Sequence, residues 1–312
     1  MKRYGWLLGC CLFLSIGMLW AADEPDLRML QQKAAQSRDM EGYVGVCKYL
    51  YQTEENPELL LLYADSIHQL ATKSKKPEQL VEYYIWASEG NFIKGDFQQG
   101  YALKRKAIAL AEKAGLKFAI SQSCCDMGYY CNVDARYDSA RYYFRKGLEA
   151  GEDLSEAGEA CRTMLTNYAS SFLFEGKTDS ALVYTIRASE RSAADKDTAM
   201  LIENLNQLGT IYRRKKNLEN CIANFEQALH LCELRGNHNA VAFIYGNIAT
   251  AYCDWNRPVD AIPFSEKAVE YALKTGNKRR IGTCYVNLGA IQIRLVQMRA
   301  EGIATLLKAI PI

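Results

Sequence analysis

Proline is scarce in this chain. Only 6 of the 312 residues are proline, and no stretch is rich in proline and serine or carries a block of one charge. Linkers and disordered tails usually have such compositions, so the sequence predicts neither. The hydrophobic share of 49% and the charged share of 24% are ordinary for a folded soluble protein.

An excess of one charge is also missing. The 38 Lys and Arg residues nearly balance 36 Asp and Glu residues, which leaves a formal net charge of +2. Binding to the phosphate backbone needs a clear basic excess. We therefore expect this segment to bind no nucleic acid directly.

Motifs for catalysis and metal binding are absent from the sequence. There is no P-loop, no G-x-S-x-G and no H-E-x-x-H. No C-x-x-C occurs, and the three histidines do not lie near cysteines at the spacing of zinc ligands. We expect a protein that is not an enzyme and that needs no cofactor and no metal.

Cysteine is plentiful, but its number does not suit a disulfide framework. Nine cysteines follow residue 22, and an odd number cannot all pair within one chain. Several stand where small residues are expected, which favours buried hydrophobic thiols. An alternative, which we favour less, is a thiol-dependent enzyme that uses Cys124, Cys125 and Cys131 on one predicted helix.

Long apolar runs are missing except at the N-terminus. Lys2 and Arg3 precede an apolar segment from Trp6 to Trp20, and Ala21 and Ala22 follow it. This order predicts a secretory signal peptide over residues 1–22. The alternatives are an uncleaved anchor and a lipoprotein with a lipobox ending at Cys10. All three predict an exported chain, periplasmic or associated with the cell envelope. We expect the chain to contact the membrane only through such an N-terminal anchor or through a missing downstream part.

Residue types recur at a fixed interval. Leu208, Gly209, Tyr212, Cys221, Phe225, Ala228 and Gly236 have counterparts 40 residues later in Ile248, Ala249, Tyr252, Ala261, Ser265, Ala268 and Gly276. The frame extends back through Tyr168, Ala169, Phe172, Ala181 and Ala188, and through Met127, Gly128, Cys131, Ala140, Phe144 and Gly147; it extends forward through Leu288 and Gly289. Each interval predicts two amphipathic helices that can bury their apolar faces only against neighbouring pairs.

This spacing resembles the tetratricopeptide repeat (TPR). The resemblance rests on Leu208-Gly209-x-x-Tyr212 followed by a small, an aromatic and a small residue on the next helix. It implies an all-α fold, a right-handed superhelical α-solenoid of antiparallel helix pairs. The 40-residue step exceeds the usual 34 and is similar to long-repeat TPR arrays, such as those of kinesin light chains and bacterial regulators. HEAT or armadillo repeats rank second, because they lack this spacing of small and aromatic residues.

The chain is predicted to have three parts. Residues 1–22 form the signal peptide, residues 23–76 form irregular helices that cap the solenoid, and residues 77–312 form the TPR array. Helices are expected over residues 27–36, 40–52, 57–72 and 77–92. The last segment, residues 301–312, is apolar and has no polar capping helix after it. We expect either that the array is incomplete at the C-terminus or that a partner covers its end.

A polar ladder is the best functional indication. The residue before the Leu of the motif is Asp126, Asn167, Gln207, Asn247 or Asn287 in successive repeats. In the resemblance these positions line a concave groove, and amides can donate to and accept from a peptide backbone. Other expected groove residues are Thr163, Ser170, Glu203, Asn206, Thr210, Arg213 and Thr250. The alternative is that the amides only bond to the adjacent repeat.

These features predict a non-catalytic module that binds a protein or peptide. The leader and the long repeats also resemble the periplasmic TPR sensor portion of envelope regulators from Bacteroides-like bacteria. That resemblance implies a role in signal transduction. A scaffold for envelope assembly, without signalling, is the alternative.

Overall fold

The described part of the chain is helical. The computed structural model describes residues 27–53 and 56–310, and within them lie helices α2 to α16, two short 3-10 helices and no strand. The predicted signal peptide lies outside the described residues. The chain divides into two compact units, Met1–Ser171 and Phe172–Ile312.

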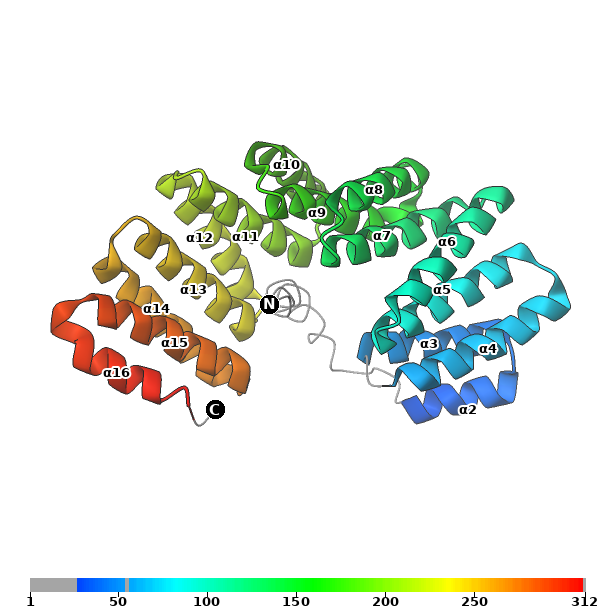
Figure 1. The fold of residues 1–312 in the computed structure, drawn as a ribbon, viewed down its shortest axis with the longest axis horizontal. Coiled ribbons are helices and arrows are strands. Elements are labelled where there is room, and N and C mark those ends of the chain that lie inside the picture. Colours follow the sequence, from blue (N-terminus) through cyan, green and yellow to red (C-terminus); the bar gives the residue numbers. More distant parts are fainter. Residues whose placement is uncertain (1–26, 54–55, 311–312) are drawn as a thin grey trace. The chain divides into compact units, whose positions relative to one another are not determined.

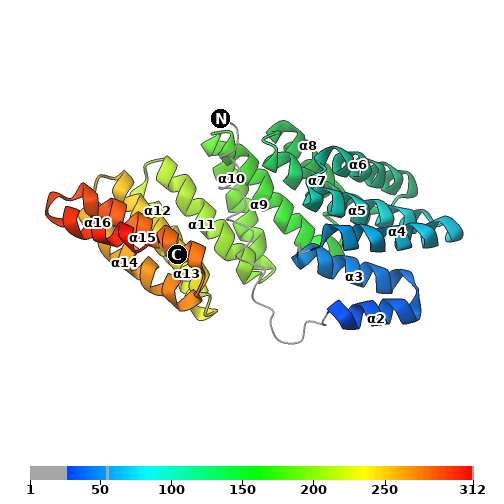
Figure 2. The ribbon, with the colours of Figure 1, turned by 60° about the horizontal axis from the view of Figure 1, so that its bottom comes forward.

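Unit 1 holds the helices from α2 into α9. Their bounds are α2 Leu27–Ser37, α3 Met40–Thr53, α4 Pro57–Ser74, α5 Pro77–Lys94, α6 Phe97–Ala114, α7 Lys117–Val133, α8 Tyr137–Gly151, the 3-10 helix Ser155–Ala157 and α9 Gly158–Phe174. Consecutive helices from α2 to α8 contact one another, and α3 to α6 lie side by side in Figure 2.

Unit 2 repeats the same arrangement. Its helices are α10 Thr178–Ala194, α11 Thr198–Arg214, α12 Leu218–Leu234, α13 His238–Asp254, α14 Pro258–Thr275, α15 Lys278–Arg294, the 3-10 helix Val296–Met298 and α16 Arg299–Leu307. The pairs α11–α12, α13–α14 and α15–α16 follow one another in Figure 1, and the first helices α11, α13 and α15 contact in sequence.

Residues with positive φ recur in the turns between helices at the repeat interval. Residues with positive φ occur within successive pairs at Gly95, Ala135, Gly176, Lys216 and Asn256, and between pairs at Lys75, Gly115, Lys196, Gly236 and Gly276. The steps are 40 or 41 residues, apart from one step between pairs where the 3-10 helix before α9 intervenes. Gly236 and Gly276 adopt φ values of 63° and 65°, which glycine accepts without steric cost. The turn prediction for these two residues is confirmed.

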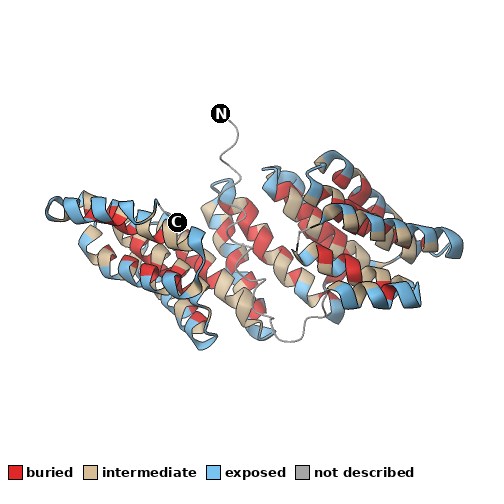
Figure 3. Ribbon diagram, turned by 90° about the horizontal axis from the view of Figure 1, so that it is seen from below, coloured by how far each residue is buried: buried red, intermediate tan, exposed pale blue. Residues whose placement is uncertain are grey.

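Small residues bring the two helices of a pair together. The ring of Phe225 on α12 packs against Gly209 on α11, so closely that a Cβ there would overlap it. Phe144 on α8 packs in the same way against Gly128 on α7. Cys221, Phe225, Ala228, Ala261, Ala140 and Phe144 are fully buried. Figure 3 shows the buried positions along the helices and the exposed ones at their ends.

The four N-terminal helices form where the sequence predicts them. Pro57 and Pro77 occupy first-turn positions of α4 and α5, and Asn56 caps α4 by accepting the Leu59 N–H at 2.9 Å. Residues of α2 to α4 share one apolar core with α5 and α6. The contact boundary between residues 171 and 172 falls inside α9. It does not address the proposed change of repeat type at residue 76, which stays a prediction.

The all-α solenoid prediction is confirmed by these contacts. Neighbouring helices pack in sequence within each unit, as stacked pairs must do to bury their apolar faces. None of the described helices combines the length and the apolarity needed to cross a bilayer. Ile303, Leu307 and Ile310 in and after α16 are exposed, and the expectation that a partner covers them stays a prediction.

Candidate functional site

The predicted site residues all lie on the first helix of a pair. Asp126 is on α7; Thr163, Asn167 and Ser170 are on α9; Glu203, Asn206, Gln207, Thr210 and Arg213 are on α11; Asn247 and Thr250 are on α13; and Asn287 is on α15. These residues belong to two units, so the contacts within unit 1 and within unit 2 are described in turn.

Unit 2 brings two of the predicted amides into direct contact. Asn247 Nδ2 donates to Asn206 Oδ1 at 2.7 Å, which links α13 to α11. Seven residues further along both helices, Arg213 Nε lies 3.6 Å from Asp254 Oδ2. Thr210 and Thr250 lie between these two contacts and donate to carbonyls of their own helices. We call Asn206, Thr210, Arg213, Asn247, Thr250 and Asp254 the polar face of unit 2.

The ladder positions differ in their partners. Gln207 Oε1 accepts from Thr185 Oγ1 at 3.1 Å, so this amide contacts the preceding helix α10. Asn287 is exposed on α15. The two interpretations of the ladder, a bond to a neighbouring helix and an accessible groove residue, therefore apply to different residues. Gln207 bonds to a neighbouring helix, whereas Asn287 remains accessible. Whether any of these residues binds a partner stays a prediction.

In unit 1, the ladder position Asp126 belongs to a buried ionic cluster. Lys104 on α6 is fully buried and contacts both Glu89 on α5 and Asp126, the latter at 2.9 Å. Tyr130 donates to Glu89 Oε2 at 2.7 Å. Burial raises the pKa of Glu89, and Lys104 opposes this rise. Two carboxylates thus share one ammonium group inside the unit.

Our sequence reasoning missed Lys104, although a signal was present. Gly100, Lys104, Ala107 and Ala111 follow helical spacing along α6, and all four are buried. A lysine in such a stripe of small residues is expected to have a buried partner, because an unpaired buried ammonium is costly.

A second amide contact lies in unit 1. Asn132 Nδ2 on α7 donates to the backbone oxygen of Asn167 on α9 at 3.0 Å. Both side chains are buried, and among the described residues Asn132 Oδ1 and Asn167 Nδ2 have no hydrogen-bond partner. Buried polar atoms are normally satisfied, so these two atoms are exceptions within the packing of α7 against α9.

Glu203 stands out among the predicted site residues. It lies one helical turn before Asn206 on α11, and the residue is partly exposed. Its Oε2 atom is enclosed and has no hydrogen-bond partner among the described residues. Burial alone raises the pKa of Glu203 to about 7.

The cysteines are packed as the sequence predicts. The nine cysteines after residue 22 form no disulfide, and all except the half-buried Cys253 are buried. Burial raises the pKa of Cys124 to about 12, and it also raises the pKa of Cys125 and of Cys131 above the usual value of a thiol. Since the thiolate is the reactive form, this group is poorly suited to thiol chemistry.

A thiol titration is expected to reflect this burial. In a Cys10→Ser/Cys11→Ser background, native protein at pH 8 should show at most one fast-reacting thiol, Cys253, and unfolded protein should show nine. Cys253→Ser should remove the fast phase. Fast modification of Cys124, Cys125 or Cys131 in the native protein would instead revive the thiol-enzyme alternative.

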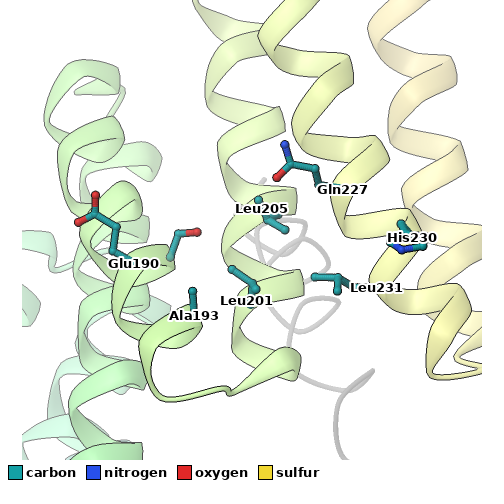
Figure 4. A pocket seen from close by; sticks show the side chains of 8 residues that line it. Glu190, Ala193, Leu201, Leu205, Gln227, His230 and Leu231 are labelled. Carbon is teal, nitrogen blue, oxygen red and sulfur yellow. The ribbon is translucent and has the colours of Figure 1, made fainter.

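One hollow lies in unit 2. It has a volume of ≈ 450 Å³ and is lined mainly by apolar atoms of α10, α11 and α12, including Ala193, Leu201, Leu205 and Leu231 (Figure 4). Glu190 and His230 stand at opposite sides of it in Figure 4. In the described ranges, no group of His, Cys, Asp and Glu could hold a metal ion.

Comparison with known proteins supports the repeat assignment. The sequence model of the tetratricopeptide repeat matches residues 198–274, which hold α11 to α13 and nearly all of α14. No protein of curated function matches the sequence.

Three solved structures illustrate the similarity of fold. The apo form of RapI has a TM-score of 0.68 at 11% identity, covering 90% of this chain and 79% of that one. Aspartyl phosphate phosphatase F from Bacillus subtilis has a TM-score of 0.59 at 14% identity, covering 91% and 87%. The Rap conjugation gene regulator of the plasmid pLS20, solved in complex with the Phr* peptide, has a TM-score of 0.57 at 12% identity, covering 90% and 83%. Identities this low show similarity of fold alone.

Proposed function

We propose that this tetratricopeptide-repeat protein is a non-catalytic module that binds an extended peptide segment along the polar face of unit 2. Repeat solenoids bury their cores between neighbouring pairs and present continuous helix surfaces, and such surfaces suit extended partners. The partner class is a protein or a peptide.

The amide contact between α11 and α13 carries this proposal. The Asn247 to Asn206 bond uses one donor and one acceptor. Each side-chain amide has two N–H donors and an oxygen with two lone pairs, so the pair keeps further capacity of both kinds. A peptide backbone offers a complementary N–H and C=O at every residue. The bond also holds both amides in a fixed orientation, which lowers the entropic cost of binding.

The comparisons favour a peptide over a small molecule. One protein of this fold was solved with a peptide bound. Another is named as a phosphatase, so the fold does not by itself exclude catalysis. In this chain, the raised thiol pKa values weigh against the one catalytic alternative that the sequence offered.

Amide truncation is expected to separate binding from stability. Asn247→Ala combined with Asn287→Ala should weaken binding to a random library of acetylated, amidated nonapeptides by about tenfold, because one or two hydrogen bonds of about 1 kcal/mol each are lost. Asn287→Ala alone should change the free energy of unfolding by less than about 0.5 kcal/mol, since the residue is exposed. Binding is measured by fluorescence anisotropy and unfolding by circular dichroism in urea.

Asn224→Ala is the matched control for this experiment. Asn224 is on α12, and its side chain donates only to a carbonyl of its own helix. The control should leave peptide binding unchanged. Equal binding by the double variant and by the control would rule out the polar face as the site, and a loss of several kcal/mol of stability would identify the amides as structural.

We further propose that the chain is exported and forms the sensing part of an envelope regulator. The support is the predicted signal peptide together with the long repeats. Recovery of the protein in the cytoplasmic fraction would refute export. A membrane span and an effector domain downstream in the reading frame would support sensing, whereas a stop codon with no such sequence would favour the scaffold alternative.

A further inference from the structure

We propose that Glu203 makes the polar face selective for peptides that carry a lysine or arginine side chain, whose cation pairs with the Glu203 carboxylate. This inference rests on the proposed peptide binding and adds the chemical class of the ligand. It assigns Glu203 as a residue that determines specificity rather than one that binds the peptide backbone.

The position of Glu203 suits a side-chain contact. Glu203 precedes Asn206 by three residues on α11, so their Cβ atoms are neighbours about 5–6 Å apart on one side of the helix. A peptide backbone held by Asn206 and Asn247 would lie one helical turn from Glu203. Side chains of an extended peptide alternate between its two sides. A lysine or arginine on the side facing Glu203 has a long aliphatic stem with the charge at its end, and can span that gap.

The surroundings of Glu203 provide the driving force. Its Oε2 atom is enclosed and lacks a hydrogen-bond partner among the described residues, although the residue as a whole is partly exposed. An enclosed acceptor without a partner is unfavourable, and more so when it is charged. Burial is the one cause that raises the pKa of Glu203 to about 7, and no cation among the described residues lowers it. A ligand ammonium or guanidinium that reaches the carboxylate from its partly exposed side would supply a charge-assisted bond.

Two arginines on these first helices already have partners. Arg213 lies beside Asp254. Arg280 Nε bonds to Asn239 Oδ1 at 3.0 Å, and its guanidinium lies 5.1 Å from the ring centroid of Phe243. Phe243 follows Glu203 by one 40-residue repeat, so the equivalent position on α13 is aromatic rather than acidic. The acidic character of this position on α11 is therefore not shared by α13.

The test uses the full chain and four synthetic libraries. Each is a set of acetylated, amidated nonapeptides with a fixed central residue, which is arginine, lysine, glutamine or norleucine, and random residues elsewhere. Wild-type protein is expected to bind the arginine and lysine libraries at least about tenfold more tightly than the other two. Glu203→Gln should reduce this preference to within twofold and leave the affinity for the glutamine and norleucine libraries unchanged. Glu226→Gln, an exposed change on α12, should behave as wild type.

The outcomes separate this inference from the proposed function. If Glu203→Gln keeps the tenfold preference, or if wild type shows none while still binding all libraries in an Asn247-dependent way, Glu203 is not the selector and peptide binding stands. If wild type binds no library, both ideas fall. Removal of an enclosed carboxylate should not impair folding, and the far-ultraviolet circular dichroism spectrum of each variant verifies this.

Discussion

Replacing Lys104 with methionine is expected to lower the free energy of unfolding by about 3–5 kcal/mol. The Lys104 side chain has no exposed surface, and its ammonium group is held between Glu89, which is 3% exposed, and Asp126, which is 25% exposed. Methionine fills the space but leaves two carboxylates close together without a cation. Removing one partner of a buried ionic group is far more costly than replacing the whole group, because an uncompensated charge remains.

The loss should depend on pH in a defined direction. Without Lys104, burial and the nearby charge of Asp126 raise the pKa of Glu89 above that of the unfolded chain. The variant's deficit should therefore be smaller near pH 4, where Glu89 can be protonated, and larger above pH 6. Urea unfolding near pH 4 and above pH 6, followed by circular dichroism, measures this deficit in the free energy of unfolding. Hydrogen exchange should place the weakening in α5, α6 and α7.

A matched change on the same helix controls for the loss of one positive charge. Lys113 is exposed in the last turn of α6, and Lys113→Met should cost less than about 1 kcal/mol. Adding Glu89→Gln to Lys104→Met should restore part of the stability, since one of the two stranded charges is removed. Equal losses in the Lys104 and Lys113 variants would show that the buried cluster contributes nothing particular.

Much of the fold could be predicted from local residue patterns in the sequence. Gly209 and Phe225 recur as a small and a large residue at fixed spacing, and they pack as that pattern requires. Gly236 and Gly276 mark helix ends because few other residues adopt their backbone angles easily. These predictions succeed because each depends on residues within one repeat or its nearest neighbour.

The partners of polar side chains could not be predicted in the same way. Gln207 and Asn247 occupy the same repeat position, yet Gln207 bonds to Thr185 on α10 and Asn247 bonds to Asn206 on α11. The difference arises from the neighbours: the position before the ladder residue is Asn206 on α11 but Gly246 on α13 and Val286 on α15. A hydrogen bond between repeats requires the right residue on both helices, and the ladder pattern specifies only one of them.

Glu203→Gln is expected to make the protein more stable at neutral and alkaline pH, by up to about 3 kcal/mol at pH 8. Burial raises the pKa of Glu203 from 4.5 to about 7, and each unit of difference between folded and unfolded chain corresponds to about 1.4 kcal/mol. Because the pKa of Glu203 is higher in the folded chain than in the unfolded chain, the folded chain binds more protons between about pH 4.5 and about pH 7. Stability from this group is therefore lost as pH rises from about 4.5 to about 7, and then stays constant.

The glutamine variant removes this titration while keeping the shape of the side chain. Unfolding in urea, measured for both proteins from pH 4.5 to pH 8, should show nearly equal stability at the acid end and a growing advantage for the variant above pH 5. Other titrating groups are common to both proteins and cancel in the difference. A constant difference over this range would show that Glu203 titrates normally. A site residue that weakens the free protein at pH 7 is best understood as one whose stabilising partner arrives with the ligand, because none of the described residues supplies a cation that lowers its pKa.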